Sequence, residues 1–413
     1  MNRKSKISRT NIIGYRRRSS SKEEEEVAAA KSRSTLEILP CAIVIDILSR
    51  LPLKNIFHCR CVSKTWLNLL LSPDFARTHL MRSPSSLLLQ WSKHRRKGGQ
   101  SLFSLDLKAT NVLHRSARLK FDFLLTKRRY NLSDSCNGLV CLCDSVSHNP
   151  VCILNPLTGD YITLPQSQRR FEVDIPFCGM GFCPKTNQYK LIRFVCRHTP
   201  PSPLSWEVEI FTLGTASWRS TGCTPKSVPT SGYYRISNGS LNWLDFRLNS
   251  SECIWSFDFS NETVRSFPPP PQFGPHHEDV LYWMRLGVLD DCLCICDSPS
   301  GSYFDIWVMK EYGVQESWTK QFVIDAPVLD GPWNDYLPIK LLNDGEILML
   351  QNGETLVSYS FGEKSVKKVK IRGIPSNIDA VSYLPSFVSF KDIAMGENLK
   401  VLNVKSSCAD SAL

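Results

Sequence analysis

The sequence predicts a mainly β protein in which a small N-terminal helical module is followed by a β-propeller of about six blades. Two observations lead to this fold class. Apolar residues follow helical spacing only within 35–80, and a unit of short strands then recurs about every fifty residues. We expect four parts: a disordered tail over 1–34, the helical module over 35–80, the propeller over 85–395 and a flexible tail over 396–413.

The N-terminal tail carries most of the net charge. Residues 1–22 contain eight Lys or Arg and no acid, so +3 of the net charge of +11 remains for the rest of the chain. Polar, Ser-rich segments bury too little apolar surface to fold alone. We interpret the tail as a solvated arm, with nuclear import through Arg16-Arg17-Arg18 or an organelle transit peptide as alternatives. The basic clusters at 93–97 and 127–129 lack interleaved aromatic residues, so nucleic-acid binding is not expected.

The sixteen cysteines lie mostly in apolar stretches, where a thiol behaves as a small hydrophobe. The N-terminus lacks the apolar region of a secretory signal peptide. No apolar run reaches the roughly eighteen residues that a membrane helix needs. We therefore expect reduced thiols, no membrane span, and a location in the nucleus, the cytoplasm or both.

The helical module is expected to begin at Pro40, which suits a first helical turn, and its first helix to end at Pro52. Apolar residues at 43, 44, 47, 48 and 51 have the spacing of one helical face. Two further helices are predicted over about 54–60 and 63–71, the second ended by Ser72-Pro73. Three helices of this size enclose a small core, and their apolar residues exceed what it can hold. Some of them should stay exposed as a docking surface.

Four segments of this module carry a resemblance to a known family, namely LP at 39–40, ILSRLP at 47–52, RCVSKTW at 60–66 and SPDF at 72–75. Their order and spacing resemble the plant F-box. This resemblance implies that the module binds a Skp-type adaptor and, through it, a cullin and the ubiquitin-transfer machinery. It also implies that eight residues line or brace the adaptor interface: Leu39, Pro40, Ile47, Leu48, Leu51, Pro52, Val62 and Trp66.

Two features of this resemblance qualify the expected interface. Cys41-Ala42 stands where the family commonly has two acidic residues, which removes favourable charge from a helix N-terminus and should weaken adaptor binding slightly. Several of the eight residues could instead form the helical core. For Trp66 the core and the interface are equally good interpretations, since a large aromatic side chain serves in both places.

The repeated unit is an apolar strand, a turn and a second short strand, and its six copies contain Leu105, Leu154, Phe211, Phe257, Val308 and Tyr359 at equivalent positions. The separations are 49, 57, 46, 51 and 51 residues. A period near fifty with four short strands is typical of a kelch-like propeller. Segments at 135–144, 235–246, 285–297 and 340–351 pass from a turn signal into an apolar strand, as an inner blade strand should. Seven blades and a two-sheet sandwich remain alternatives.

Ring closure is expected between the C-terminal segment 380–390 and residues 85–91, because an open ring would leave edge strands. Residues 130–373 resemble the plant F-box-associated interaction domain, in segments that include SCNGLVCL, LNPLTGDYITLP and ISNGSLNWL. The resemblance implies a substrate receptor behind an adaptor-binding head.

Motifs of catalysis are absent from the sequence, which contains no G-x-S-x-G, no phosphate-binding G-x-x-x-x-G-K-[ST], no H-E-x-x-H and no C-x-x-C. We therefore expect no enzyme, no cofactor and no metal. Three sets of closely spaced cysteines are interpreted as buried packing: Cys292/Cys294/Cys296, Cys59/Cys61 and Cys141/Cys143. The ligand-like run 276–279 (HHED) follows a proline-rich stretch and is interpreted as an exposed loop.

The function that the sequence favours is a non-catalytic specificity subunit, in which the helical module holds the ligase scaffold and the propeller holds an unknown target protein. An adaptor-binding scaffold or inhibitor without target delivery is one alternative, and a propeller-borne hydrolase is another. Exposed aromatic candidates for target contact are Trp206, Trp218, Trp243, Trp333 and Tyr336, of which Trp333 is favoured. Trp218 and Trp318 recur at one position of the repeat, so we expect both to pack between blades.

Overall fold

The computed structural model describes residues 39–92, 100–105, 112–113, 115–120, 130–145, 149–165, 174–197, 205–229, 234–245, 253–273, 284–298, 302–325, 329, 334–342, 344–371, 378–393 and 400–403. The chain divides into two compact units, Met1–Thr78 and His79–Leu413, which are described separately. Within the described residues no helix is long and apolar enough to cross a membrane.

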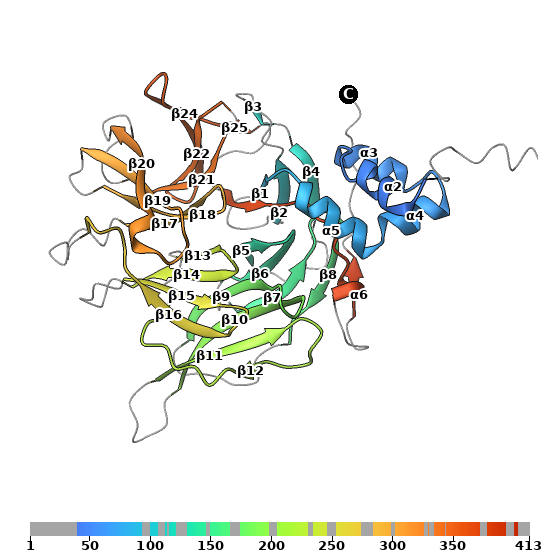
Figure 1. Ribbon diagram of the computed structural model, residues 1–413, viewed down its shortest axis with the longest axis horizontal. Helices are drawn as coiled ribbons and strands as arrows, with labels where there is room; N and C mark the ends of the chain where they lie inside the picture. Colours follow the sequence, from blue (N-terminus) through green and yellow to red (C-terminus); the bar gives the residue numbers. More distant parts are fainter. Residues whose placement is uncertain are drawn as a thin grey trace, which may run out of the picture. The chain divides into compact units, whose positions relative to one another are not determined.

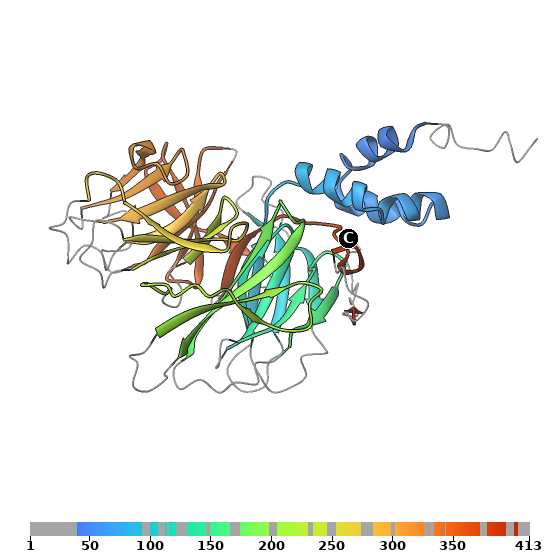
Figure 2. The same ribbon diagram turned by 60° about the horizontal axis from the view of Figure 1, so that its bottom comes forward.

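The N-terminal unit is helical, as predicted (Figure 1, Figure 2). Its helices are α2 (Cys41–Leu48), α3 (Leu53–Cys59), α4 (Lys64–Leu70) and the beginning of α5 (Pro73–Arg82). Pro40 and Pro52 occupy the N-cap positions of α2 and α3, where the fixed φ of proline suits helix entry. The Ser63 hydroxyl caps α4 by accepting a hydrogen bond from the Trp66 amide at 3.2 Å.

The fourth helix was not predicted, because Ser72-Pro73 was interpreted only as a stop signal. Pro73 is instead the first residue of α5, a position where its missing amide hydrogen is not needed. The Ser72 hydroxyl accepts a hydrogen bond from the Phe75 amide at 3.2 Å, as an N-cap does. The same dipeptide therefore ends one helix and starts the next.

The second unit is a six-bladed β-propeller, in which five sheets have four antiparallel strands and the sheet of blade 2 has five (Figure 1). The innermost strands of successive blades contact one another around a closed ring, which contradicts the sandwich and seven-blade alternatives. From the innermost strand outwards, blade 1 contains β26 (Ile378–Tyr383), β1 (Ser86–Ser92), β2 (Gln100–Leu105) and β4 (Arg115–Lys120); blade 2 contains β5 (Tyr130–Cys136), β6 (Leu139–Asp144), β7 (Pro150–Leu154) and β8 (Asp160–Thr163); and blade 3 contains β9 (Asp174–Cys183), β10 (Gln188–Arg197), β11 (Ser205–Thr212) and β12 (Arg219–Ser220).

The remaining blades follow the same order. Blade 4 contains β13 (Tyr234–Ser237), β14 (Ser240–Leu244), β15 (Ile254–Asp258) and β16 (Thr263–Phe267); blade 5 contains β17 (Arg285–Leu289), β18 (Cys292–Asp297), β19 (Tyr303–Met309) and β20 (Trp318–Asp325); and blade 6 contains β21 (Tyr336–Leu341), β22 (Ile347–Gln351), β23 (Thr355–Ser360) and β24 (Ser365–Lys368). Smaller elements are a parallel pair of β3 (Val112–Leu113) with β25 (Lys370–Ile371), the 3₁₀ turn η4 (Gln315–Ser317) and helix α6 (Phe390–Ile393).

The ring closes in blade 1, as predicted, because β26 near the C-terminus pairs with β1. The antiparallel register runs from Ser86 opposite Tyr383 to Trp91 opposite Ile378. The innermost strand of this blade thus comes from the end of the chain and its other three strands from the start of the propeller. This arrangement leaves no unpaired strand at the seam of the ring.

The six predicted repeats occupy the outer half of each blade, so that the positions chosen as equivalent all fall in third strands. The segments that were predicted as inner strands contain the second strands β6, β14, β18 and β22, and two of them, 235–246 and 285–297, also contain most or all of the innermost strands β13 and β17. Asn137-Gly138 and Asn238-Gly239 make the turns that precede β6 and β14, and all four residues have positive φ. Two-residue turns of this kind match the twist of a hairpin, which explains why Asn-Gly marks them.

The segment 396–413, which was expected to be a flexible tail, contains a short strand. Leu402 and Asn403 form β27, which pairs with β8 and adds a fifth strand to blade 2. The Asn403 side-chain amide donates to Asp160 Oδ1 at 2.6 Å. The predicted tail 1–34 and residues 404–413 lie outside the described residues.

Candidate functional site

Helix α2 carries apolar side chains on two sides. Val44, Ile45 and Leu48 are buried. Ile43 and Ile47, one turn apart, are 47% and 40% exposed, and Leu39 just before the helix is 37% exposed. Residues four apart lie on one helical face, so Ile43 and Ile47 form a short exposed row. We call Leu39, Ile43 and Ile47 the apolar row.

The other predicted adaptor-binding residues differ in their accessibility. Pro52 is exposed, and Val62, between α3 and α4, is 63% exposed. Pro40 is also exposed, whereas Leu51 and Trp66 are half-buried. Leu48 is only 2% exposed, so of the two roles that the resemblance implies, lining or bracing the interface, its burial fits bracing. It belongs to the side of α2 that faces the helical core, where it can brace the surface but not touch a partner.

Two exposed apolar residues were missing from the predicted interface. Ile43 is part of the apolar row, and Leu71, between α4 and α5, is half exposed. The four-residue spacing of Leu39, Ile43 and Ile47 was visible in the sequence. It was not used, because periodicity alone does not say which part of a wide apolar stripe the neighbouring helices cover.

The charge of the helical unit is positive around these apolar residues. Five Lys or Arg and two Asp between residues 39 and 78 give a net charge of +3. Arg50 Nε lies 3.1 Å from Asp46 Oδ2 in an exposed ion pair on α2, and the Arg60 guanidinium lies 5.7 Å from the centre of the Phe57 ring. The first turn of α2 contains no acid, as Cys41-Ala42 predicted. Such a surface suits a partner with acidic residues around an apolar groove.

The aromatic residues proposed for target binding differ in how far the propeller buries them. Trp333 lies outside the described residues. Trp243 and Tyr336 are buried, which contradicts their prediction as exposed contacts. Trp243 Nε1 donates to Ser227 Oγ at 3.0 Å, and the Tyr336 hydroxyl accepts from Gln351 Nε2 at 2.9 Å. Trp206 is half-buried and packs against the core of blades 3 and 4.

Trp218 and Trp318 pack between blades, as predicted from their repeated position. Trp218 Nε1 of blade 3 donates to the carbonyl of Pro165, at the end of blade 2, at 3.2 Å. Trp318 Nε1 of blade 5 donates to the carbonyl of Pro268, at the end of blade 4, at 3.4 Å. The two tryptophans therefore make the same contact in two places, Trp218 between blades 2 and 3 and Trp318 between blades 4 and 5.

The cysteines that were predicted to be buried are buried in the propeller except for the half-buried Cys292, whereas in the helical unit Cys59 is half-buried and Cys61 is exposed. Cys294 and Cys296 are buried, and Cys292 packs against the same core between blades 5 and 6. Burial also raises the pKa of Cys296 well above its usual value. Cys61, by contrast, is exposed, because it lies in the turn after α3 rather than in the core. The ligand-like run 276–279 lies outside the described residues.

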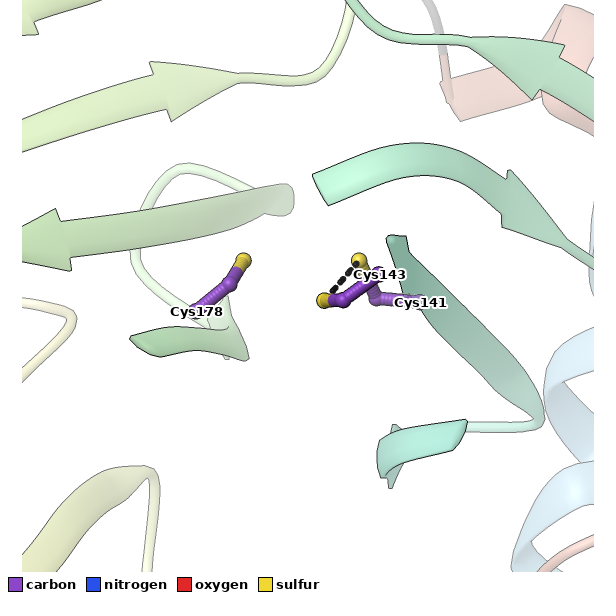
Figure 3. Close-up of side chains that lie close together, drawn as sticks. All are labelled: Cys141, Cys143 and Cys178. Carbon is purple, nitrogen blue, oxygen red and sulfur yellow. Dashed lines mark hydrogen bonds between the residues drawn. The ribbon is translucent and has the colours of Figure 1, made fainter. Parts of the chain in front are cut away.

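A cluster of three thiols lies between blades 2 and 3. Cys141 and Cys143 come from β6, and Cys178 from β9 extends its sulfur toward them (Figure 3). The three Sγ atoms all lie within 4.8 Å of one another, and Cys141 Sγ and Cys143 Sγ are 4.0 Å apart. All three residues are buried. Cys141 and Cys143 were predicted as packing, but the contribution of Cys178 from the next blade was missed.

The pKa values of two of these thiols, Cys141 and Cys178, lie above the ordinary value of a cysteine. Hydrogen bonds from Cys143 and Cys178, together with burial, raise the pKa of Cys141 well above its usual value. For Cys178, a hydrogen bond from Cys141 lowers the pKa, but Cys143 and burial outweigh it and the pKa is well above the ordinary value. Neutral thiols suit an apolar environment, because a lone buried thiolate would be costly.

Comparison with known proteins covers most of the chain. Residues 36–78 match the F-box domain family, and residues 101–390 match the family of the F-box associated beta propeller domain. The F-box protein CPR1 of Arabidopsis thaliana is 28% identical over 385 residues, which is 85% of this chain and 88% of the relative. The F-box/kelch-repeat protein At3g23880 of the same plant is 26% identical over 373 residues, 86% of this chain and 96% of the relative.

Proposed function

Because the chain belongs to the F-box proteins that carry an F-box associated β-propeller domain, we propose that it is the substrate-recognition subunit of a Skp–cullin–F-box ubiquitin ligase. The helical unit binds the Skp-type adaptor, which connects the chain to a cullin. The propeller binds a target protein for ubiquitination and degradation. The chain itself contributes binding and not bond making, in keeping with a family whose members are typically non-catalytic adaptors.

One observation supports this role above the others: the small helical unit leaves several large apolar side chains in water. Leu39, Ile43, Ile47, Val62 and Leu71 are each at least a third exposed. Burying an Ile or Leu side chain contributes about 1.5–3 kcal/mol, so a partner that covers this set gains substantial free energy. The surrounding positive charge favours an acidic partner and accelerates its association.

The rate enhancement that such a subunit provides comes from proximity. A target held by the propeller meets the ubiquitin-transfer machinery at the effective concentration of tethered partners, which reaches roughly millimolar. The reaction between a target lysine and the ubiquitin-loaded carrier then behaves as an intramolecular reaction. No side chain of this chain has to take part in the chemistry.

The adaptor interface is tested by replacing apolar residues of the apolar row with charged ones. In the double variant Ile43→Arg/Ile47→Arg the exposed row becomes cationic, while the buried face of α2 is unchanged. We expect affinity purification of this variant from plant cells to lose the Skp-type adaptor and the cullin but to keep its target. Val323→Arg is the matched control, since Val323 is 49% exposed on blade 5. Adaptor retained by the double variant at the wild-type level refutes the assigned surface.

Target delivery is tested separately from adaptor binding. When the gene for this chain is removed, a substrate receptor leaves at least one protein undegraded, so that protein accumulates and regains a normal level on re-expression. A scaffold or inhibitor without target delivery leaves every protein level unchanged or lowers some. Quantitative proteomics distinguishes a substrate receptor from a scaffold or inhibitor. The complementation control is the Ile43→Arg/Ile47→Arg variant, which is expected not to bind the adaptor.

The proposed location is the nucleus, the cytoplasm or both, where thiols stay reduced and cullin ligases operate. Its support is the reduced state of the described cysteines and the basic run Arg16-Arg17-Arg18. A fluorescent fusion of the full chain should show signal in these compartments. Replacement of the three arginines by alanine should lower the nuclear share if the run is an import signal. A fusion protein found only inside an organelle contradicts the proposal.

A further inference from the structure

The thiol cluster between blades 2 and 3 has the composition of a metal site. We propose that Cys141, Cys143 and Cys178 bind one soft, thiophilic metal ion, with Cu(I) as the ion that fits best. The proposal goes beyond substrate recognition and does not depend on it. Its starting point is that strands of two different blades bring three sulfur atoms to within 4.8 Å of one another.

The spacing of the sulfur atoms matches three-coordinate binding. With a metal–sulfur bond of about 2.3 Å, two sulfurs of a trigonal site lie about 4.0 Å apart. Cys141 Sγ and Cys143 Sγ are 4.0 Å apart. Cys178 Sγ, on the opposite side of the cluster in Figure 3, lies no more than 4.8 Å from either, so it has to move by less than about 1 Å. A χ1 adjustment of a small side chain provides such a movement.

The surroundings select a soft ion. Cys136 and Met180 belong to the same buried core, which therefore contains five sulfur side chains among aliphatic and aromatic ones. Thiolate and thioether ligands favour Cu(I), whereas carboxylate and water ligands favour hard cations. Zn²⁺ also accepts thiolates but takes four ligands in a closed site, and the described residues of this cluster supply three Cys and no His, Asp or Glu.

The fold explains how the cluster is held. Cys141 and Cys143 are two residues apart in β6, so they lie on the same face of the strand, and the pairing of β6 with β7 shifts register between Leu142 and Cys143. Cys178 and Met180 are likewise two apart in β9. The two strands are in contact across the interface between blades 2 and 3. Packing of the ring therefore places the ligands before any ion arrives.

Binding exchanges protons for the ion. Each thiol that forms a Cu–S bond gives up its proton to solvent, and Cu(I) stays Cu(I), so no oxidant or reductant is consumed. Arg193 is paired with Cys178 in the register of β10 and β9, and its guanidinium lies 4.3 Å over the Trp218 ring and is paired with Glu209. This positive charge partly offsets the negative charge of the thiolates.

The experiment uses the full chain, purified under reducing conditions, after alkylation of accessible thiols to silence the exposed Cys41 and Cys61. Cu(I) is supplied in a complex with a colorimetric chelator, and transfer to the protein is measured by loss of the chelator colour and by elemental analysis. We expect one Cu(I) per chain and a new sulfur-to-copper absorption band in the ultraviolet.

Two variants decide whether the ion is at this cluster. Cys178→Ala removes the ligand from blade 3 and should lower Cu(I) affinity at least tenfold. Cys152→Ala is the matched control, because Cys152 is equally buried in blade 2 but belongs to a different core. It should bind as the wild type does. Metal-free thermal unfolding confirms that both variants fold, and Cys141→Ala replaces Cys178→Ala if the latter does not.

Three results overturn the proposal. The first is absence of stoichiometric Cu(I) transfer to the wild-type chain, which leaves the thiols as apolar packing. The second is equal Cu(I) binding by the wild type and Cys178→Ala. The third is binding of Zn²⁺ at one ion per chain with no measurable Cu(I) affinity, which requires a fourth ligand that the cluster does not contain.

Discussion

Gly138 lies against Ser386 so closely that a side chain at position 138 would have no room. A Cβ atom on Gly138 would come within 2.2 Å of Ser386 Cβ and within 2.6 Å of the Leu384 carbonyl oxygen. Gly138 is in the turn between β5 and β6, and Ser386 follows β26, the strand that closes the ring. Asn155 strengthens this junction, since its side-chain amide donates to the carbonyls of Ser386 and Val388 at 2.9 Å.

Gly138→Ala should therefore destabilise the propeller strongly. Its φ of +83° already disfavours alanine by about 1–2 kcal/mol, and the clash with the C-terminal segment adds about 1–3 kcal/mol. Gly239→Ala is the control, because Gly239 occupies the equivalent turn of blade 4 at φ +66° with nothing within 4 Å of its Cβ position. Urea unfolding of both variants, followed by tryptophan fluorescence, measures the difference. Equal losses of stability would show that the Ser386 contact does not matter.

Ser63 sets the start of α4 in the adaptor-binding unit. Ser63→Ala removes the hydroxyl that accepts from the Trp66 amide, which should lower helix stability by about 1 kcal/mol. Hydrogen exchange at the amides of α4 measures this loss directly, and faster exchange is expected from Trp66 onward. Thr65→Ala is the control, because Thr65 is exposed inside the helix and caps nothing. Unchanged exchange in Ser63→Ala would remove the cap from the explanation of where α4 begins.

His79 makes the stability of the second unit sensitive to acid. It is buried, its ring packs edge-on against Phe387 at 4.9 Å, and burial lowers its pKa to about 4. An unfolded histidine titrates near pH 6.5, so the unfolded chain binds the proton first as pH falls. The contribution of neutral His79 is fully present above pH 6.5 and is lost between pH 6.5 and 4, by at most about 1.4 kcal/mol per pH unit.

His79→Leu provides the test, since leucine fills the site without titrating. The difference in unfolding free energy between wild type and variant should change across this pH range and stay constant above pH 7. Chemical denaturation at a series of pH values measures it. A constant difference from pH 7 down to pH 4.5 would contradict burial of a neutral histidine.

Some of these features follow from the sequence and others do not, for identifiable reasons. The repeats were predictable because the strands of each blade alternate apolar and polar residues and are joined by turns of two or three residues. Both features leave a local pattern in the sequence. Contacts between blades leave no local pattern in the sequence. Nothing near Cys143 in the sequence points to Cys178, because only the packing of blade 2 against blade 3 brings them together. Nothing near Gly138 points to Ser386, because only ring closure brings that pair together. The apolar surface of α2 was predictable only in part. Its apolar stripe is a local pattern in the sequence, but which side of the stripe is buried depends on contact with α4.

Asp297 lowers the stability of the propeller at neutral pH. Its carboxyl group is buried opposite Asp305 in the register of β18 and β19. Burial raises the pKa of Asp297 to about 6, with a smaller contribution from the negative charge of Asp305. A hydrogen bond from the Ser298 backbone and the positive charge of Lys320, which lies 2.6 Å from Asp305, act in the opposite direction. The folded chain thus holds this proton to higher pH than the unfolded chain, whose aspartates titrate near pH 3.9. Stability therefore falls as pH rises from about 4 to 6 and stays low above that.

Asp297→Asn should remove this penalty, because the amide has nearly the shape of the protonated acid and cannot ionise. We expect the variant to be more stable than wild type by about 2–3 kcal/mol at pH 7.5, and the advantage to fall to about 1 kcal/mol at pH 4.5. Thermal unfolding at both pH values measures the two differences. Asp325→Asn, at the end of β20, is the control for loss of one negative charge and should show no comparable dependence on pH. A variant less stable than wild type at pH 7.5 would mean that the Asp297 carboxylate is ionised and well bound in the fold.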